Sequence, residues 1–285
     1  MITADLVRTR VKTLPSLPTT VVALGQAVSD DRCTVDRILG ILAKDPPLSA
    51  SLLRLANSLA YCGDNKVSDL RNAVMRLGYD AILNLGRTAG VIRTFRGANH
   101  LDPLKLWQHS VAVGMVAKGI CRLLKKRPLE ETAFLAGLLH DIGKIALDRC
   151  FTEEYNPVFE AIEAGEFCVD AEKRLLGMSH AEVGAMVAVH WNFSDTLVEV
   201  IRDHHAPPAD AFLPSLINLC DLLVRSRIPT GPYDETLAFV LEDSPVFHTV
   251  FHDIPEESLD VERITFSIDD ELEHAITFVQ LAFQD

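Results

Sequence analysis

Apolar residues recur along this chain at the spacing of one helix face. In the stretch 104–126 they follow one another at intervals of three and four residues. Between residues 272 and 283 the intervals are four, three and four, at Leu272, Ile276, Val279 and Phe283. Residues 1 to about 100 show no alternation of polar and apolar positions over the length of a strand. The pattern predicts an all-α protein built from many helices.

Proline, glycine and capping residues divide the first hundred residues into short helices. The pattern predicts helices over 35–43, 49–57 and 68–78. The Pro46–Pro47 pair separates the first two, because proline cannot continue a helix. Gly78 suits the C-terminal end of the third. Three polar residues at these boundaries are interpreted as capping and turn residues, not as catalytic ones: Asp45, Asn57 and Ser58.

A histidine and a carboxylate interrupt the most apolar part of the sequence. Residues 138–147 read LLHDIGKIAL, and the residues before them are apolar on nearly every side, as in a helix enclosed by other helices. We therefore expect His140 and Asp141 inside the protein. A buried carboxylate needs a partner, since leaving it unpaired is costly. The pair is either structural and hydrogen-bonded, or contributes two of several ligands to a metal ion.

Further polar residues are expected to face inward from other helices. His109 lies on the apolar face of the 104–126 helix. The sequence of residues 179–182, SHAE, fits a capping box, which places His180 in the first turn of a helix. Asp221 is the single charge of an apolar helix and needs a cation if it is buried. The complete set of these residues is His109, His180, His204, His205 and Asp221.

Together with His140 and Asp141, these residues predict a metal centre. Five imidazoles and two carboxylates are far more than a helical core ordinarily buries. They could hold one or two divalent transition-metal ions, for which iron, manganese, nickel and zinc are better suited than magnesium. The alternative is a helical adaptor in which the same residues form a buried hydrogen-bonded network without metal. Trp107 is expected in the core and His190 at the surface.

Composition and charge exclude several classes of protein. The 285 residues, 48% of them hydrophobic, suit a globular protein of one large or two ordinary domains. The net charge is −13, and no basic stretch contains interleaved aromatic residues, so nucleic acid is not an expected partner. No apolar run approaches the roughly 20 residues that span a bilayer. The start lacks signal-peptide regions and the six cysteines form no C-x-x-C pair, so we expect reduced thiols and a cytoplasmic location.

The order of these residues resembles a known family. His109, His140-Asp141 and Asp221 resemble the H…HD…D signature of the HD superfamily of metal-dependent phosphohydrolases, and the sequence HDIGK at 140–144 strengthens the match. The first half resembles the amino-terminal part of HDOD domains. The segments that carry this resemblance are LPSLP at 14–18, DPPLSASLLRLANS at 45–58, and residues 68–78.

The resemblance implies an all-helical HDOD fold in three parts. Residues 1–100 would form an N-terminal helical half, packed on an HD-type metal-binding core at 101–230. Residues 231–285 hold fourteen Asp or Glu against Arg263 alone. We expect this last part to be an acidic helical extension that packs on the core.

The additional histidines resemble those of the related HD-GYP phosphodiesterases, which cleave cyclic di-guanylate at a centre of two or three metal ions. His180, His204 and His205 occupy matching places in the order. The Gly-Tyr-Pro loop of that family is absent, because His205 is followed by Ala-Pro-Pro at 206–208. This departure argues against cyclic di-guanylate hydrolysis but leaves the ligand set intact.

The resemblance implies a bacterial signal-transduction protein that acts as a regulator or scaffold, with a signalling protein or a nucleotide as partner. Many HDOD domains have lost the metal ligands, and this sequence departs from that pattern because it retains them. The alternative is an active phosphohydrolase on a nucleotide or cyclic dinucleotide. Its catalytic residues would be Asp141, on the ions, and Lys144, on a phosphate oxygen. Lys144 is otherwise a surface lysine, and Gly143 allows close approach of a ligand or of backbone. The sequence leaves catalysis and oligomeric state open.

Overall fold

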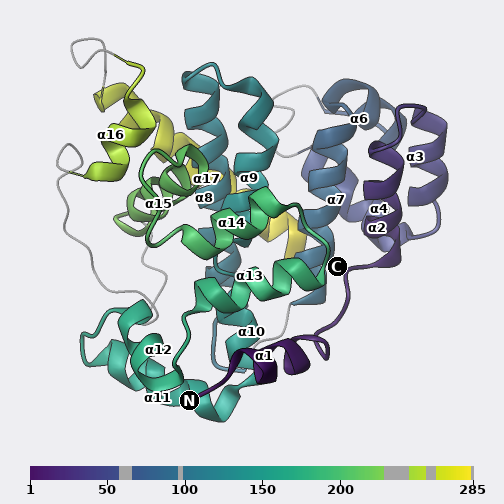
Figure 1. Cartoon of the computed structure of the whole chain (residues 1–285). Coiled ribbons are helices and arrows are strands. Elements are labelled where there is room, and N and C mark those ends of the chain that lie inside the picture. Colours follow the sequence, from purple (N-terminus) through teal and green to yellow (C-terminus); the bar gives the residue numbers. More distant parts are fainter. Residues whose placement is uncertain (58–65, 96–98, 228–243, 255–260, 284–285) are drawn as a thin grey trace. The chain divides into compact units, whose positions relative to one another are not determined.

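The structure, a computed structural model, describes residues 1–57, 66–95, 99–227, 244–254 and 261–283, without the side chains of 261–267, 282 and 283. Within these ranges the secondary structure is helical and contains no strand (Figure 1). The predicted all-α fold is confirmed. Among the described helices, none combines the length and the apolarity that crossing a bilayer requires. Ser58 and the Phe283 side chain, both used in the sequence analysis, lie outside the described residues.

The chain divides into two compact units. The first comprises Met1–Leu14 and Gly97–Leu272, and the second comprises Pro15–Arg96 and Glu273–Asp285. The first fourteen residues therefore group with the histidine-rich helices and not with the residues that follow them. The division near residues 100 and 230 stays a prediction.

The second unit is built around α7 (Tyr79–Thr94), which packs against three other helices of the unit. Gly90 of α7 allows the close contact with α2, because a Cβ atom at this position would lie 2.8 Å from Val21 Cγ2. Leu24 and Leu52 are fully buried in this unit. The other helices that lie wholly within the described part of this unit are α2 (Thr19–Val28), α3 (Val35–Leu42), α4 (Pro46–Ala56) and α6 (Leu70–Leu77).

The predicted capping residues hold the helix ends of the second unit. Asp45 accepts a hydrogen bond of 3.0 Å from a backbone N–H in the first turn of α4, and Arg93 donates to both of its carboxylate oxygens. The Asn57 side chain donates to the carbonyl of Val67 and accepts from its N–H. The capping and turn interpretation is confirmed for these two residues. Helix α4 begins at Pro46, three residues before the predicted start, because proline is tolerated in a first turn.

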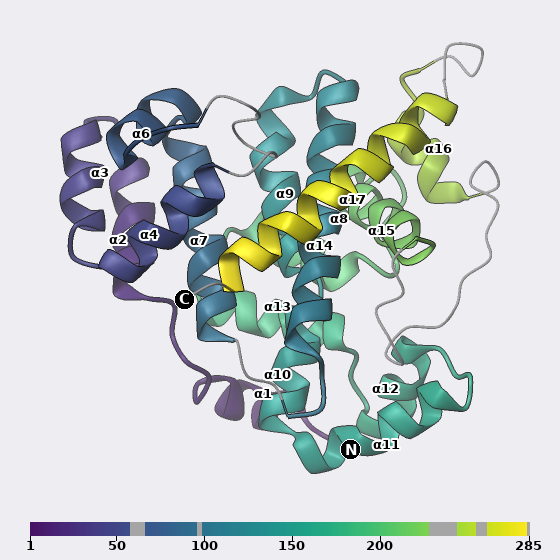
Figure 2. The ribbon, with the colours of Figure 1, turned by 180° about the vertical axis from the view of Figure 1, so that it is seen from behind.

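The first unit places helices around a common centre. Helix α8 packs along α9, α10 packs on α13, α13 on α14, and α15 on both α8 and α9. Figure 2 shows α17 passing across α8, where Glu271 lies next to Gly119. The helices are α1 (Ala4–Val11), α8 (Pro103–Leu123), a 3-10 helix (Arg127–Leu129), α9 (Glu130–Leu139), α10 (Ile142–Cys150), α11 (Thr152–Glu163), α12 (Cys168–Leu176), α13 (His180–His190), α14 (Asp195–Asp203), α15 (Phe212–Arg225), α16 (Pro245–Phe251) and α17 (Val261–Phe283), whose last residues, from Glu273, belong to the second unit.

Candidate metal centre

His140 and Asp141 lie at a break between two helices. Helix α9 ends at Leu139 and α10 begins at Ile142. The helix expected around His140 is therefore interrupted at these two residues. Both residues are buried, as the sequence predicts. Because the chain turns here, the ring and the carboxylate face the same side, with His140 Nε2 3.4 Å from Asp141 Oδ2.

Two glycine contacts bring the helices of this centre together. Where α8 meets α9, a Cβ atom at Gly137 would lie 2.5 Å from the Gly114 Cα atom. Where α10 meets α13, a Cβ atom at Gly143 would lie 1.8 Å from the His180 carbonyl oxygen. Side chains larger than hydrogen would separate these helices. The close approach predicted at Gly143 is thus an approach to the backbone of α13.

One group of potential ligand atoms surrounds His109, and we call it position one. It consists of His109 Nε2, His140 Nε2, Asp141 Oδ2 and Asp221 Oδ1. His109 Nε2 lies 3.3 Å from the His140 atom, 3.1 Å from the Asp221 atom and 3.9 Å from the Asp141 atom. His140 Nε2 lies 3.8 Å from Asp221 Oδ1. All four side chains are buried.

A second group, position two, lies on the other oxygen of the same carboxylate. It consists of Asp141 Oδ1 and the Nε2 atoms of His180, His204 and His205. His180 Nε2 lies 3.2 Å from Asp141 Oδ1 and 2.9 Å from His205 Nε2. His204 Nε2 lies 4.0 Å from Asp141 Oδ1. His205 is half-buried and the other three are buried. All seven predicted metal ligands therefore converge, and Asp141 faces both positions.

Hydrogen bonds behind the histidines turn nitrogen lone pairs towards Asp141. His140 and His204 each donate from Nδ1 to a backbone carbonyl, at 2.7 and 2.8 Å, and His180 Nδ1 lies 2.7 Å from Glu172 Oε2. A neutral imidazole that donates from Nδ1 has only a lone pair at Nε2. His204 Nε2 is buried and makes no hydrogen bond within the described part of the chain. Lone pairs that face a carboxylate need a cation between them, so the residues fit a metal ion.

Electrostatics favour the metal-binding forms of Asp141 and His204. Burial opposes ionisation of Asp141, but His140 and other basic neighbours hold its pKa well below the usual range. Burial and the neighbouring histidines lower the pKa of His204 to about 3, which leaves its ring neutral at pH 7. Burial would lower the pKa of His180, yet Glu172 and Asp141 raise it well above the usual range.

Two basic residues pair with the carboxylates of the centre. Lys144 Nζ lies 3.0 Å from Asp141 Oδ2, and Lys144 is only 5% exposed, so its interpretation as a surface lysine is wrong. Arg225 Nη2 lies 2.8 Å from Asp221 Oδ2 and is the cation that a buried Asp221 requires. Arg225 itself was not predicted, although its spacing, four residues after Asp221, is that of a helical ion pair.

Glu172, which is fully buried in α12, was not predicted as part of the centre. Its carboxylate accepts hydrogen bonds from the backbone N–H of His180 at 2.7 Å and from the Tyr155 hydroxyl at 2.8 Å, in addition to its contact with the His180 ring. A signal was present in the sequence. Glu172 lies four residues after Cys168 and four before Leu176, which places it on the apolar face of its helix.

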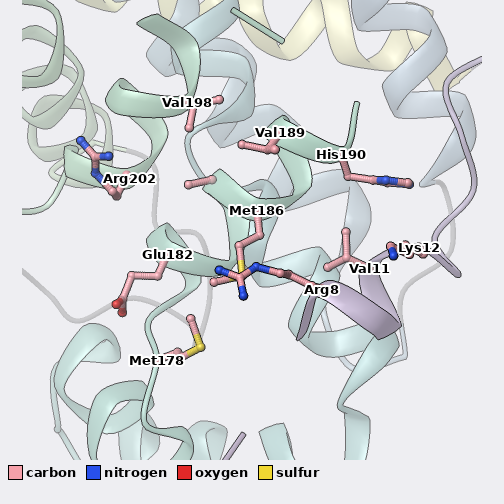
Figure 3. Close-up of a pocket in the computed structure, with 11 residues that line it drawn as sticks. Arg8, Val11, Lys12, Met178, Glu182, Met186, Val189, His190, Val198 and Arg202 are labelled. Atoms are coloured by element: carbon pink, nitrogen blue, oxygen red, sulfur yellow. The ribbon is translucent and has the colours of Figure 1, made fainter. Parts of the chain in front are cut away.

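The residues expected away from the centre lie away from it. Trp107 is buried in the core and His190 is exposed. His190 lines a groove of about 540 Å³ formed by residues of α1, α13 and α14, among them Arg8, Met186 and Val189 (Figure 3). None of the seven predicted ligands lines this groove.

Comparison with known proteins shows related sequences and structures. A crystal structure of an HDOD domain protein from Geobacter sulfurreducens has 24% identity and a TM-score of 0.82, and the match covers 99% of this chain and all of that one. A structure from Shewanella amazonensis, provisionally named a phosphohydrolase, has 22% identity and a TM-score of 0.75 over 97% and 98% of the two chains. An uncharacterized protein of Treponema pallidum is 23% identical over 239 residues, which are 79% of this chain and 45% of that protein.

These matches differ in what they show. At such identities the solved structures show the fold alone, and this chain spans less than half the length of its relative from Treponema pallidum. The model of the HDOD domain family, by contrast, matches residues 14–207, which is more than half of the chain. The matched range contains every predicted ligand except Asp221. The chain therefore belongs to the HDOD family.

Proposed function

We propose that the core of this HDOD protein binds two divalent transition-metal ions, one at each position. The gathering of seven side chains into two groups, each of which includes one oxygen of Asp141, carries the proposal. Atoms bound at about 2.0 to 2.2 Å to one ion lie roughly 3 to 4 Å from one another. The separations at position one, 3.1 to 3.9 Å, and at position two, 2.9 to 4.0 Å, agree with this spacing.

The donor atoms favour particular metals. Position two offers three imidazoles and one carboxylate, and position one offers two of each. Such mixed nitrogen and oxygen sets suit iron, manganese, nickel or zinc, whereas magnesium prefers oxygen ligands and keeps several waters. A metal of the first group is therefore the expected occupant.

The bound ions serve a regulatory role in signal transduction. Six of the seven ligands are at most 2% exposed, and His205 alone is half-buried. Ions enclosed in this way stabilise one arrangement of the helices that supply the ligands. A signalling protein or a nucleotide that distinguishes this arrangement from the metal-free one would respond to metal occupancy.

Phosphoester hydrolysis is the second candidate, and the position of Lys144 favours it. The Lys144 ammonium lies 3.0 Å from Asp141 Oδ2, where it could contact a phosphate oxygen drawn to the ions. Ions of this kind lower the pKa of a bound water to about 7, which supplies a nucleophile. In this role Asp141 holds the ions and Lys144 orients the phosphate of a nucleotide or cyclic dinucleotide. The name of the Shewanella amazonensis relative supports this class of reaction.

Elemental analysis of the full chain, purified without chelator, tests metal binding. We expect about two equivalents of iron, manganese, nickel or zinc per chain, and a clear loss in His204→Ala, which removes a buried donor. His190→Ala is the matched control, because this exposed histidine lies outside the centre. A folded wild-type chain that takes up none of the four metals would overturn the proposal.

A phosphodiester assay separates the two roles. The metal-loaded chain is incubated with bis(p-nitrophenyl) phosphate and with cyclic dinucleotides. Turnover that is lost in Lys144→Ala, with metal content unchanged, supports the enzyme. A loaded chain without turnover, in which metal changes the affinity for a protein or nucleotide partner, supports the regulator.

A further inference from the structure

The ligands of the two metal positions have neighbours of opposite charge: a carboxylate at position two and two cations at position one. At position two, Glu172 contacts the ring of His180 on the side away from Asp141, with Glu172 Oε2 2.7 Å from His180 Nδ1. The second oxygen of Glu172 accepts a hydrogen bond from the Tyr155 hydroxyl at 2.8 Å and a weaker one from Cys168 Sγ at 3.6 Å. All of these residues are buried. A carboxylate held in this way fixes the imidazole ring and makes its far nitrogen a stronger donor.

Position one has the opposite surroundings. Lys144 pairs with Asp141 Oδ2, the oxygen that faces position one, and Arg225 pairs with the second oxygen of Asp221 at 2.8 Å. Both cations repel an incoming metal ion and compete for its carboxylate donors. His109 Nδ1 is buried and makes no hydrogen bond within the described residues, so nothing there supports its ring as Glu172 supports His180.

Access to the two positions differs as well. Every ligand side chain of position one is buried. Position two includes His205, the one half-buried ligand. An ion from solution therefore meets a partly accessible donor only at position two.

We propose that the two positions are unequal: position two holds the tighter, resident ion, and position one fills second, at a higher free metal concentration. Glu172 is the positioning residue that strengthens position two. The inference rests on the proposed two-metal function and adds a regulatory property to it. Occupancy of position one would follow the free metal concentration, while position two stays filled.

Titration of the metal-free full chain with Zn²⁺, against a chelator of known affinity, tests the order of filling. Native mass spectrometry counts the ions per chain at each step. We expect the one-ion species to dominate before the two-ion species appears. Glu172→Gln, which keeps the size of the side chain and removes its charge, should weaken the first step about 10- to 100-fold and leave the second step unchanged.

Ligand variants assign each step to a position. His205→Ala should lose the tight step, whereas His109→Ala should keep the tight step and lose the weak one. Arg225→Gln should strengthen the weak step, and Arg225→Lys, which retains the charge, is its matched control. If Glu172→Gln does not fold by circular dichroism, Tyr155→Phe removes only the hydroxyl that holds Glu172 and should weaken the tight step by less.

The outcomes separate the inference from the proposed function. Two ions bound with equal affinity, or a tight step that survives His205→Ala and disappears in His109→Ala, would overturn the inference and leave the two-metal function standing. A folded wild-type chain that binds no Zn²⁺ would overturn the proposed function itself.

Discussion

At the scale of single residues, Asp141 connects the fold with the chemistry of the centre. Its two oxygens face different groups of ligands, with His180 Nε2 3.2 Å from Oδ1 and His140 Nε2 3.4 Å from Oδ2. The carboxylate is buried, yet its basic neighbours keep its pKa low. Gly143, two residues later, allows α10 to approach α13 closely enough for this arrangement. The centre therefore depends on a residue that carries no functional group.

Gly143→Ala should disrupt this approach. The new Cβ atom would lie 1.8 Å from the His180 carbonyl oxygen and 2.7 Å from the Gly184 nitrogen, and backbone atoms cannot rotate away. Helices α10 and α13 must then separate, and we expect a loss of stability on the order of 3 kcal/mol or more. Chemical denaturation measures the change in free energy of unfolding.

Gly40→Ala is the matched control for this substitution. Gly40 lies in α3, is exposed, and has no neighbouring atom within 4 Å of the position of a Cβ atom. Alanine favours a helix interior, so this variant should be more stable than the wild type by up to about 1 kcal/mol. Equal stability of the two variants would contradict the packing argument at Gly143.

At the scale of secondary-structure elements, most of the ligands lie at helix ends, whereas His109 and Asp221 lie within α8 and α15. His140 follows the last residue of α9, Asp141 precedes the first residue of α10, His180 begins α13, and His204 follows α14. Residues at helix ends need not follow the 3.6-residue repeat of a helix. The side chains of two residues that are adjacent in sequence can therefore point to the same place. The C-terminal ends of α9 and α14 also carry partial negative charge, which favours a cation near His140 and His204.

Asp45→Asn tests a helix end away from the metal centre. Hydrogen bonds from Arg93 lower the pKa of Asp45 below its usual value, against the opposing effect of burial. Asparagine still caps α4 but loses the ion pair, so we expect the variant to be less stable by about 1 to 2 kcal/mol at pH 7.

The pH dependence of this difference follows from the sign of the shift. A pKa that is lower in the folded protein contributes stability above the unfolded pKa of about 3.9, and this stability is lost as the pH falls through the folded value. Thermal denaturation at several pH values should therefore show the two proteins converging below about pH 4. A difference that stays constant down to pH 2 would exclude the ion pair as its cause.

The sequence indicated some elements of the centre and not others, for local physical reasons. The capping box at Ser179 is a short-range pattern, and the structure has it with both reciprocal hydrogen bonds. The break at His140 was not predictable, because an apolar run on both sides favours one continuous helix. Glu172 was missed because its partners, Tyr155 and His180, come from other helices, and only the tertiary structure brings them together.

At the scale of the whole molecule, the metal centre joins helices that are distant in sequence. Its ligands extend from His109 to Asp221, and all of them lie in the first unit. Bound ions would hold these helices together only in the folded state, so the free energy of metal binding contributes to the free energy of folding.

Thermal stability should accordingly depend on metal. At a free metal concentration about 100 times the dissociation constant, binding stabilises the folded chain by about 2.7 kcal/mol, which corresponds to roughly 5 to 10 °C in Tm for a unit of this size. Differential scanning calorimetry with Zn²⁺ and with excess chelator measures this shift. His204→Ala should show little shift, and a wild-type Tm that does not respond to either addition would contradict the coupling.

Anomalous diffraction from crystals of the metal-loaded full chain tests the central claim most directly. We expect two anomalous peaks on opposite oxygens of Asp141. One should lie among His109, His140 and Asp221, and the other among the side chains of His180, His204 and His205. Crystals of protein saturated with metal that show no peak at Asp141, or peaks only on surface residues, would contradict the assignment of these seven residues to a metal centre.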